Sequence, residues 1–182
     1  MQVIETPIKD LKIIQPKVFK DERGYFFESY NLEKLQELGF SNQFVQDNQS
    51  KSSYGVIRGL HYQLQPEAQT KLVRVFSGKI YDVAVDIRKN SPTFGQWFGV
   101  ELSDENYTQL LIPKGFAHGF SVLSETAVVF YKCDFNYRPD RERGIAFNDK
   151  KLNIDWKIPA NKRLVSERDR NMCGFDKAEM NF

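Results

Sequence analysis

Histidine is scarce in this chain, and one of its two copies lies in a segment that could do proton chemistry. The two are His61 and His118, and His61 falls in the strand-like run 56–63, three residues after Arg58. Histidine is the side chain that most readily takes and gives protons near neutral pH. With a guanidinium close by, proton transfer is the first chemistry to consider for this segment.

The residue types argue against a metal-binding histidine. A three-histidine site cannot be built within one chain that has two histidines. In a regular strand Arg58 and His61 would face opposite sides, so a bulge at Gly59 is needed to bring them to one site. The alternative, a buried histidine bonded to a neighbouring carbonyl group, stays open from this segment alone.

Three further groups have side chains suited to catalysis or binding. Lys71 could stabilise an anion from a cavity wall, or it and Arg74 could be surface charges on an edge strand. Tyr131 and Tyr137 are six residues apart and suit proton donation, stacking or plain packing. The segment Ser166–Asp169 combines a carboxylate with a guanidinium, or it is a solvated turn.

The elements expected around these residues are mostly strands, because β-branched and aromatic residues alternate with polar ones. Strands are predicted over residues 25–30, 44–48, 55–63, 108–112, 119–123 and 127–134. Two further runs, 73–76 and 79–87, flank Ser77-Gly78 and predict a hairpin. In the second run Asp82 and Asp86 share a face, which predicts that this face looks toward water or a polar cavity.

One short helix is expected, with Asn31 as its cap, leucines 32, 35 and 38 along one side and Gly39 at its end. The tail, residues 153–182, mixes polar and aromatic residues and is expected to pack on the main body. Many short strands and few helices in 182 residues predict a single all-β domain over residues 1–182, of the sandwich, barrel or jelly-roll type.

Bulk properties exclude several classes of protein. A net charge of +2 gives no reason to expect a nucleic-acid or membrane surface. The sequence has no run of about 18 apolar residues, so no transmembrane helix is predicted. Residues 1–19 do not resemble a signal peptide. Cys133 and Cys173 form no CxxC pair, so two reduced thiols in a cytoplasmic protein are expected.

A series of motifs runs in order along nearly the whole chain. They are Asp21–Glu28 (DERGYFFE), Phe44–Asn48 (FVQDN), Arg58–Gln63 (RGLHYQ), Gly78–Arg88 (GKIYDVAVDIR), Ser91–Trp97 (SPTFGQW), Ile112–Phe120 (IPKGFAHGF), Tyr131–Asp134 (YKCD) and Ser166–Asp169 (SERD). Together they resemble the dTDP-4-dehydrorhamnose 3,5-epimerase family of deoxysugar biosynthesis. So many motifs in one order make the resemblance specific.

The resemblance implies a metal-independent, cupin-type jelly roll (a double-stranded β-helix) with short flanking helices, usually a homodimer. Gln63 stands where metal-binding cupins usually have a second histidine, which agrees with a metal-free site. Two departures are Gln49, where many relatives have histidine, and Ala146-Phe147, where tryptophan is frequent. Neither removes a proposed catalytic group, although Gln49 could alter contacts near the substrate.

The implied activity is that of an isomerase in dTDP-L-rhamnose biosynthesis. It would epimerise dTDP-4-keto-6-deoxyglucose at C3 and C5 to dTDP-4-keto-L-rhamnose through an enolate, with no metal or nicotinamide cofactor. By family position, His61 is the base, Asp169 orients its ring, Tyr131 is the acid on the opposite face, and Lys71 is the counter-charge for the enolate.

The resemblance also implies a set of substrate-binding residues. It assigns cations to the diphosphate, an aromatic ring to thymine and hydrogen-bonding groups to sugar or base. These are Arg23, Arg58 and Arg168 for the diphosphate, Tyr137 for thymine, and Glu28, Gln46, Asp47, Asn48 and Glu142 for hydrogen bonds. His118 is expected to line the same pocket, with Asp82 fixing its tautomer.

Two kinds of alternative remain at the level of sequence. A relative that inverts only C5 or only C3, or a cupin that moves the ketone between C3 and C4, would share most motifs. The presence of both His61 and Tyr131 favours an epimerase over a ketoisomerase. A non-catalytic cupin that binds nucleotide sugars would leave the occupied acid, base and carboxylate positions unexplained.

Overall fold

The computed structural model describes residues 1–40 and 43–182, and two β-sheets form its body. In spatial order, the first sheet contains β1 (Gln2–Glu5), β2 (Lys12–Gln15), β10 (Gln109–Ile112), β7 (Lys71–Ser77), β12 (Thr126–Cys133) and β5 (Gln46–Ser53). The second contains β13 (Glu142–Gly144), β6 (Val56–Gln63), β11 (Phe116–Val122), β8 (Lys79–Asp86) and β9 (Trp97–Ser103). β14 (Leu164–Val165) runs parallel to β6. Two stacked sheets of antiparallel strands are the expected jelly-roll arrangement.

The central strands of the second sheet, β8 and β11, are buried on both faces. Ile80 and Ala84 of β8 pack with residues of the first sheet in one apolar cluster. Val83 and Val85, on the other face of β8, pack with Trp156 and the remainder of a second cluster that includes Phe175 and Met180. The prediction that residues 153–182 pack on the main body is therefore confirmed.

The helices are short and lie at the edges of the sheets. α1 (Leu32–Glu37) begins where predicted, because the Lys34 N–H donates to the Asn31 side chain over 3.1 Å. Leu35 of α1 packs on the outer face of the first sheet. The chain also forms α2 (Glu167–Arg170) and two 3₁₀ turns, Ala160–Lys162 and Phe175–Lys177. None of the described helices is long and apolar enough to cross a membrane.

The predicted hairpin across Ser77-Gly78 is wrong. β7 pairs with β10 and β12 in the first sheet, whereas β8 pairs with β9 and β11 in the second. Gly78 has a φ of 79°, and a Cβ there would lie 2.1 Å from the Thr126 carbonyl oxygen. A Ser-Gly pair indicates a tight turn, but it does not say whether the next strand stays in the same sheet.

The aspartates of β8 face the interior and not water. Neither Asp82 nor Asp86 has exposed surface. Asp82 Oδ1 lies 2.7 Å from His118 Nε2, and Asp86 accepts hydrogen bonds from the side chains of Arg88, Ser91 and Thr93. The alternation along β8 is as predicted, but both carboxylates are paired inside the protein because burial without partners would be costly.

Two predicted strands differ most from the observed bounds. The run 25–30 is a strand only over β4 (Gly24–Phe26), which pairs with β3 (Phe19–Asp21). The strand predicted over 44–48 begins at Gln46 and continues to Ser53 as β5.

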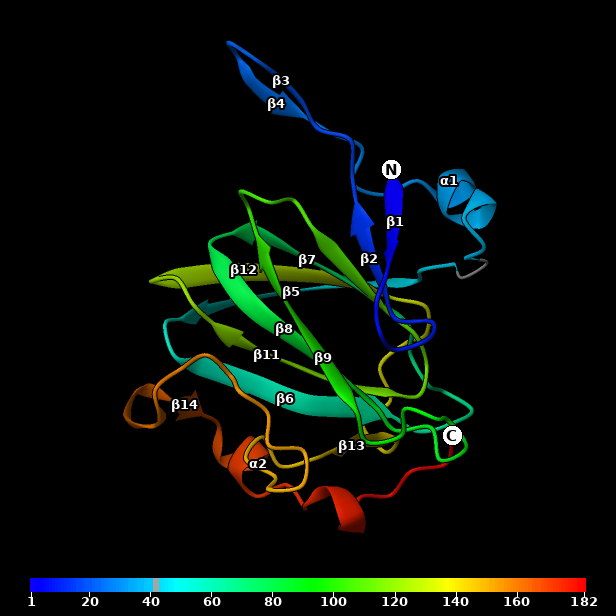
Figure 1. Ribbon diagram of the computed structural model, residues 1–182, viewed down its shortest axis with the longest axis vertical. Helices are drawn as coiled ribbons and strands as arrows, with labels where there is room; N and C mark the ends of the chain where they lie inside the picture. The colour runs from blue at the N-terminus through cyan, green and yellow to red at the C-terminus, as the bar shows by residue number, and fades with distance from the viewer. Residues whose placement is uncertain (41–42) are drawn as a thin grey trace.

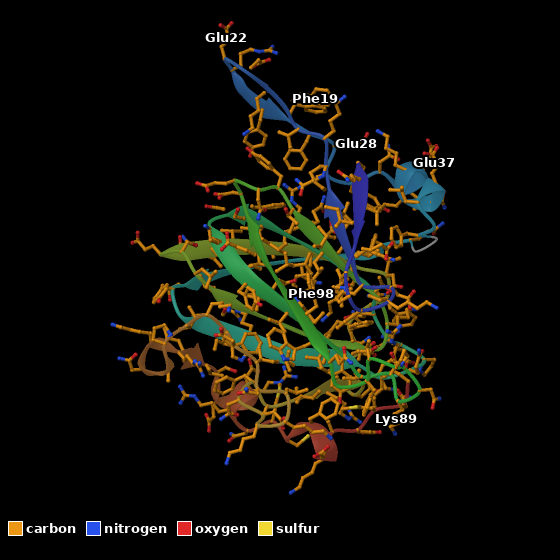
Figure 2. The ribbon with its side chains drawn as sticks, viewed as in Figure 1. Phe19, Glu22, Glu28, Glu37, Lys89 and Phe98 are labelled. Carbon is orange, nitrogen blue, oxygen red and sulfur yellow. The ribbon has the colours of Figure 1, made fainter. Side chains whose placement is uncertain are left out.

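The hairpin of β3 and β4, which we call the arm, stands away from the two sheets at the end of the molecule opposite α2 (Figure 1). Figure 2 shows Glu22 at its tip, Phe19 along it and Glu28 near its base. Its large apolar side chains are exposed: Phe19 at 54%, Tyr25 at 57% and Phe26 at 70%. The arm therefore makes little use of its apolar surface within one chain.

Candidate active site

His61 and Asp169 form a bonded pair although they are 108 positions apart. His61 Nε2 lies 2.9 Å from Asp169 Oδ1, and the Gly59 N–H donates to Asp169 Oδ2 over 3.3 Å. Burial would raise the pKa of Asp169, but the hydrogen bonds from His61 and Gly59 hold that pKa below its usual value. An ionised Asp169 can stabilise positive charge on the ring while His61 takes a proton at Nδ1.

The C-terminal segment carries Asp169 to β6. β14 pairs with the start of β6, and Leu164 lies opposite Val56. Ser166 then caps α2, because its hydroxyl oxygen accepts the Asp169 N–H over 3.1 Å. Figure 1 shows β14 and α2 beside β6. The segment Ser166–Asp169 is thus the start of a helix and not merely a solvated turn.

The bulge needed at Gly59 is present. The register of β6 against β11 shifts between Arg58 and His61, so that β6 holds one extra residue there. Gly59 has a φ of 129°, and a Cβ on it would lie 2.5 Å from Gly119 Cα. The bulge re-aims the strand, and Arg58 and His61 line the same hollow.

The first sheet supplies the opposite wall. Tyr131 of β12 lies between Asn48 of β5 and Val73 of β7 in the register, and Lys71 Nζ is 5.9 Å from the centre of the Tyr131 ring. Burial raises the pKa of Tyr131 to about 12 and lowers the pKa of Lys71. A protonated phenol and a lysine therefore share this wall.

Two hollows open between the walls. One, of about 350 Å³, is lined by Gln46, Asn48, His61, Tyr62, Gln63, Gln69, Lys71, Tyr131, Tyr137, Glu142 and Arg168. The other, of about 470 Å³, is lined by Ser50, Val56, Ile57, Arg58, His61, Phe120, Tyr131, Leu164, Val165, Ser166, Arg168 and Asp169. Since His61, Tyr131 and Arg168 line both, the hollows meet there, and we call the combined space the cleft. Its size suits a small-molecule ligand.

Two side chains of the cleft share the carboxylate of a third. The Tyr137 hydroxyl donates to Glu142 Oε2 over 2.5 Å, and the Arg168 guanidinium pairs with the same oxygen. Burial would raise the pKa of Glu142, but Arg168 and Tyr137 keep it below its usual value. An ionised Glu142 thus orients an aromatic ring and a cation at the cleft.

Known proteins match this chain along most of its length. The model of the dTDP-4-dehydrorhamnose 3,5-epimerase family matches residues 5–177. The dTDP-4-dehydrorhamnose 3,5-epimerase of Shigella flexneri is 56% identical over 180 residues, which cover 98% of each chain. The chain belongs to the dTDP-4-dehydrorhamnose 3,5-epimerase family.

Solved structures of the epimerase family confirm the cupin-type jelly roll. The Elizabethkingia anophelis dTDP-4-dehydrorhamnose 3,5-epimerase has a TM-score of 0.94 at 56% identity, over 98% of this chain and 99% of that chain. A Legionella pneumophila dTDP-6-deoxy-D-glucose-3,5-epimerase, in complex with dTDP-4-keto-L-rhamnose, has a TM-score of 0.93 at 50% identity. That match covers 97% of this chain and 93% of the Legionella chain.

Most residues implied by the family resemblance meet at the cleft. Its lining includes the expected catalytic residues His61, Tyr131, Asp169 and Lys71, and the expected binding residues Gln46, Asn48, Arg58, Tyr137, Glu142 and Arg168. His118 lies opposite His61 in the register of β6 and β11, but it is buried and bonded to Asp82. It therefore lies beside His61 on the same face of the second sheet, but it is not among the residues that line the cleft.

Three other residues with an expected binding role lie away from the chain's own cleft. Arg23 is on the arm, where it pairs with Asp21, and Glu28 near the arm's base is bonded to Lys34. Asp47 of β5 pairs with Lys132 on the outer side of the first sheet. The sequence predicted their roles from family position, but within one chain the structure does not bring them to the cleft.

The cleft lining also includes residues with no role predicted from the sequence. Phe120 lines it two positions after His118 on β11, so the period of two in a strand could have indicated it. Gln69 lines it from a loop, where its side chain donates to the Phe135 carbonyl oxygen over 2.8 Å. No sequence pattern marks Gln69.

Gln63 has a structural role at the position where metal-binding cupins usually place histidine. Its amide nitrogen donates to the carbonyl oxygens of Glu67 and Asn136, and its amide oxygen accepts the Arg138 N–H. Its amide therefore ties together the loops at this end of the cleft. Within residues 1–40 and 43–182, no three His, Cys, Asp or Glu side chains gather as metal ligands.

The two departures from the family pattern have different surroundings. Gln49 is an exposed residue of β5 opposite Phe130 and is absent from the cleft lining of its own chain. Phe147 packs at the edge of the cluster behind the second sheet, and its carbonyl oxygen accepts a hydrogen bond from the Trp156 ring over 2.7 Å.

Proposed function

We propose that the protein epimerises dTDP-4-keto-6-deoxyglucose at C3 and C5, giving dTDP-4-keto-L-rhamnose for dTDP-L-rhamnose formation. The observation that carries the proposal is the placement of a histidine–carboxylate pair and a protonated tyrosine on opposite walls of one cleft. Family membership supports the same reaction, and the Legionella relative holds the proposed product.

The substrate's C4 ketone makes the hydrogens at C3 and C5 acidic. His61 Nδ1 takes the proton from carbon, and the electron pair of the broken C–H bond moves into the enolate. Asp169, bonded to Nε2, stabilises the imidazolium that forms. The Lys71 ammonium offsets the negative charge that develops on the ketone oxygen, an interaction typically worth about 2.7–4 kcal/mol.

Inversion requires the new proton to arrive from the opposite face. Tyr131 is suited to this step because burial raises its pKa to about 12, so the phenol keeps its proton until the enolate takes it. The phenolate then recovers a proton from water, and His61 releases the one it took. Each centre loses one proton and gains one, so the reaction involves no net redox change and calls for no nicotinamide.

The polar lining of the cleft suits a nucleoside diphosphate sugar. Arg58 and Arg168 supply guanidinium groups for the diphosphate. Tyr137, held by Glu142, offers an aromatic ring to thymine, and Gln46 and Asn48 offer amides to sugar or base.

We also propose a homodimer in which the arm completes the cleft of a second copy. Arg23 and Glu28 have expected roles in substrate binding, yet they do not line the cleft of their own chain. Exposed aromatic surface of the kind on Phe19, Tyr25 and Phe26 favours a protein partner. In a two-fold dimer each subunit would give its arm to the other.

A cytoplasmic location is consistent with the cysteines. Cys133 and Cys173 are both free thiols, as expected in a reducing compartment.

Nuclear magnetic resonance in deuterated water tests the activity. We expect the protein to exchange hydrogen for deuterium at both C3 and C5 of dTDP-4-keto-6-deoxyglucose and to invert both centres. His61→Ala is expected to abolish exchange, whereas Lys79→Ala, which removes a lysine paired with Glu101 away from the cleft, is expected to exchange normally. Exchange at one centre alone would indicate a single-centre epimerase, and tight binding without exchange would indicate a binding protein.

A further inference from the structure

Tyr107 lies beneath the arm and contacts both of its sides. Its ring centre is 4.9 Å from that of Tyr25 and 5.2 Å from that of Phe27. Lys20 Nζ, from the other strand of the arm, is 5.4 Å from the centre of the Tyr107 ring. Tyr107 thus makes aromatic contacts with Tyr25 and Phe27 and a cation–π contact with Lys20.

The loop that carries Tyr107 is fixed by its own hydrogen bonds. Tyr107 has a φ of 57°, a left-handed conformation that is unfavourable for a tyrosine. Its neighbour Asn106 accepts the N–H groups of Ser103 and Thr108 through Oδ1 and donates through Nδ2 to the Glu101 carbonyl oxygen. These bonds hold the turn, so the ring projects from a rigid support.

The same loop and the strand after it bind the segments of chain that enter and leave the arm. Before the arm, the Gln15 side chain donates to the Asn106 carbonyl oxygen and accepts from the Thr108 hydroxyl, each over 2.9 Å. After the arm, the Gln109 side-chain amide donates to the Ser29 carbonyl oxygen over 2.9 Å. Hydrogen bonds therefore fix the base of the arm, and the Tyr107 ring is placed further along it.

Apart from the Tyr107 ring, few groups of the main body contact the arm. Every residue of β3 and β4 is exposed. The Arg74 guanidinium lies 5.0 Å from the Phe27 ring and reaches only the side of the arm next to β7. The direction in which the arm points thus depends on the stack of Tyr25, Phe27 and Lys20 on Tyr107.

We propose that Tyr107 is a positioning residue for substrate binding: it sets the angle of the arm so that Arg23 reaches the cleft of a second copy. This inference rests on the proposed role of the arm in the dimer. Because Tyr107 acts through Arg23 and touches no group of the proton-transfer pair, its loss weakens substrate binding and leaves the proton-transfer step intact.

The test compares Tyr107→Asn with Tyr107→Phe. Asparagine tolerates the left-handed conformation, so Y107N removes the ring without adding backbone strain, and Y107F keeps the ring. In epimerase assays we expect Y107N to raise the KM for dTDP-4-keto-6-deoxyglucose about tenfold with kcat within about twofold of wild type, and Y107F to match wild type. Trypsin is expected to cut after Lys20 or Arg23 faster in Y107N than in Y107F. An unchanged KM in Y107N would overturn the inference.

Arg23→Ala and the double variant separate this inference from the role of the arm. We expect R23A to raise KM, and Y107N to add little further in the R23A background, because both act through one group. If R23A leaves KM unchanged, the arm does not bind substrate and the proposed dimer site fails. If R23A raises KM while Y107N adds its full effect to it, Tyr107 acts by another route. Light scattering is expected to give Y107N and Y107F the same oligomeric state; a change in Y107N alone would assign Tyr107 to subunit assembly instead.

Discussion

At the scale of single residues, the walls of the cleft separate the two protons of the proposed reaction. His61 is bonded to an ionised carboxylate from α2, whereas Tyr131 lies on the first sheet with its pKa raised to about 12. A base and an acid that sat on one wall could only return the proton to the face from which it came. The loss of His61 and the loss of Tyr131 are therefore expected to affect different steps of the reaction.

Tyr131→Phe separates these steps. Without the phenol, His61 can still take the proton, so deuterium exchange at the first centre is expected to continue. Inversion is expected to fall by about 10²–10⁴-fold, the usual contribution of a positioned acid. Following exchange and product configuration by NMR measures both, with Tyr54→Phe, on an exposed tyrosine, as the control. Full inversion by Tyr131→Phe would remove Tyr131 from the acid role.

Lys71 gives the activity a dependence on alkaline pH. Burial lowers its pKa from a usual value of 10.5, and only the protonated ammonium offsets the enolate charge. As pH rises through this lowered pKa, the ammonium is lost, so the activity is expected to decline below pH 10.5. The Lys71→Arg variant is expected to have a lower kcat. Its loss of activity should move to higher pH because a guanidinium stays protonated. An unmoved decline in Lys71→Arg would assign it to another group.

At the scale of elements, strands with regular alternation could be predicted, and elements that depend on a distant partner could not. β6, β10, β11 and β12 overlap their predicted ranges. β9 was not predicted, because Gly99 interrupts its pattern. A Cβ on Gly99 would lie 2.4 Å from the Tyr81 ring of β8, so the glycine is explained only by its neighbour across the sheet. The passage of the chain at Gly78 from β7 of the first sheet to β8 of the second likewise depends on distant strand partners, and no local signal specifies it.

The bulge in β6 is an element whose cost can be measured. Gly59→Ala would place a Cβ 2.5 Å from Gly119 Cα at a φ of 129°. We expect a loss of roughly 2–6 kcal/mol, from about 1–3 for the unfavourable backbone and about 1–3 for overpacking. The thermal midpoint would fall by about 2–4 °C per kcal/mol.

Gly24→Ala provides the matched control for this prediction. Gly24 has the same φ of 129°, but nothing lies within 4 Å of a Cβ built there. The Gly24→Ala variant therefore has the unfavourable backbone conformation without the steric clash. Its melting temperature is expected to fall less than that of Gly59→Ala. Equal falls would mean that β11 moves away freely and that close packing does not hold the bulge.

At the scale of the whole molecule, the cleft could be predicted by family resemblance and not by local pattern. Ser166–Asp169 viewed alone fits a solvated turn, and only the pairing of β14 with β6 carries Asp169 to His61. Resemblance likewise assigned Arg23 and Glu28 to substrate binding, but it could not say that both residues lie outside the cleft of their own chain. The assembly decides where those two residues act.

Mixing two impaired variants tests whether the arm acts between subunits. Arg23→Ala has a defective arm and an intact cleft, and His61→Ala has an intact arm and a defective cleft. In a mixed dimer, the arm of the His61→Ala subunit would enter the cleft of the Arg23→Ala subunit and restore one site. With random exchange half of the dimers are mixed, so activity at subsaturating substrate is expected to recover to about one quarter of wild type. If each arm serves its own cleft, the mixture stays at the average of the two variants, because a mixed dimer then contains no complete site.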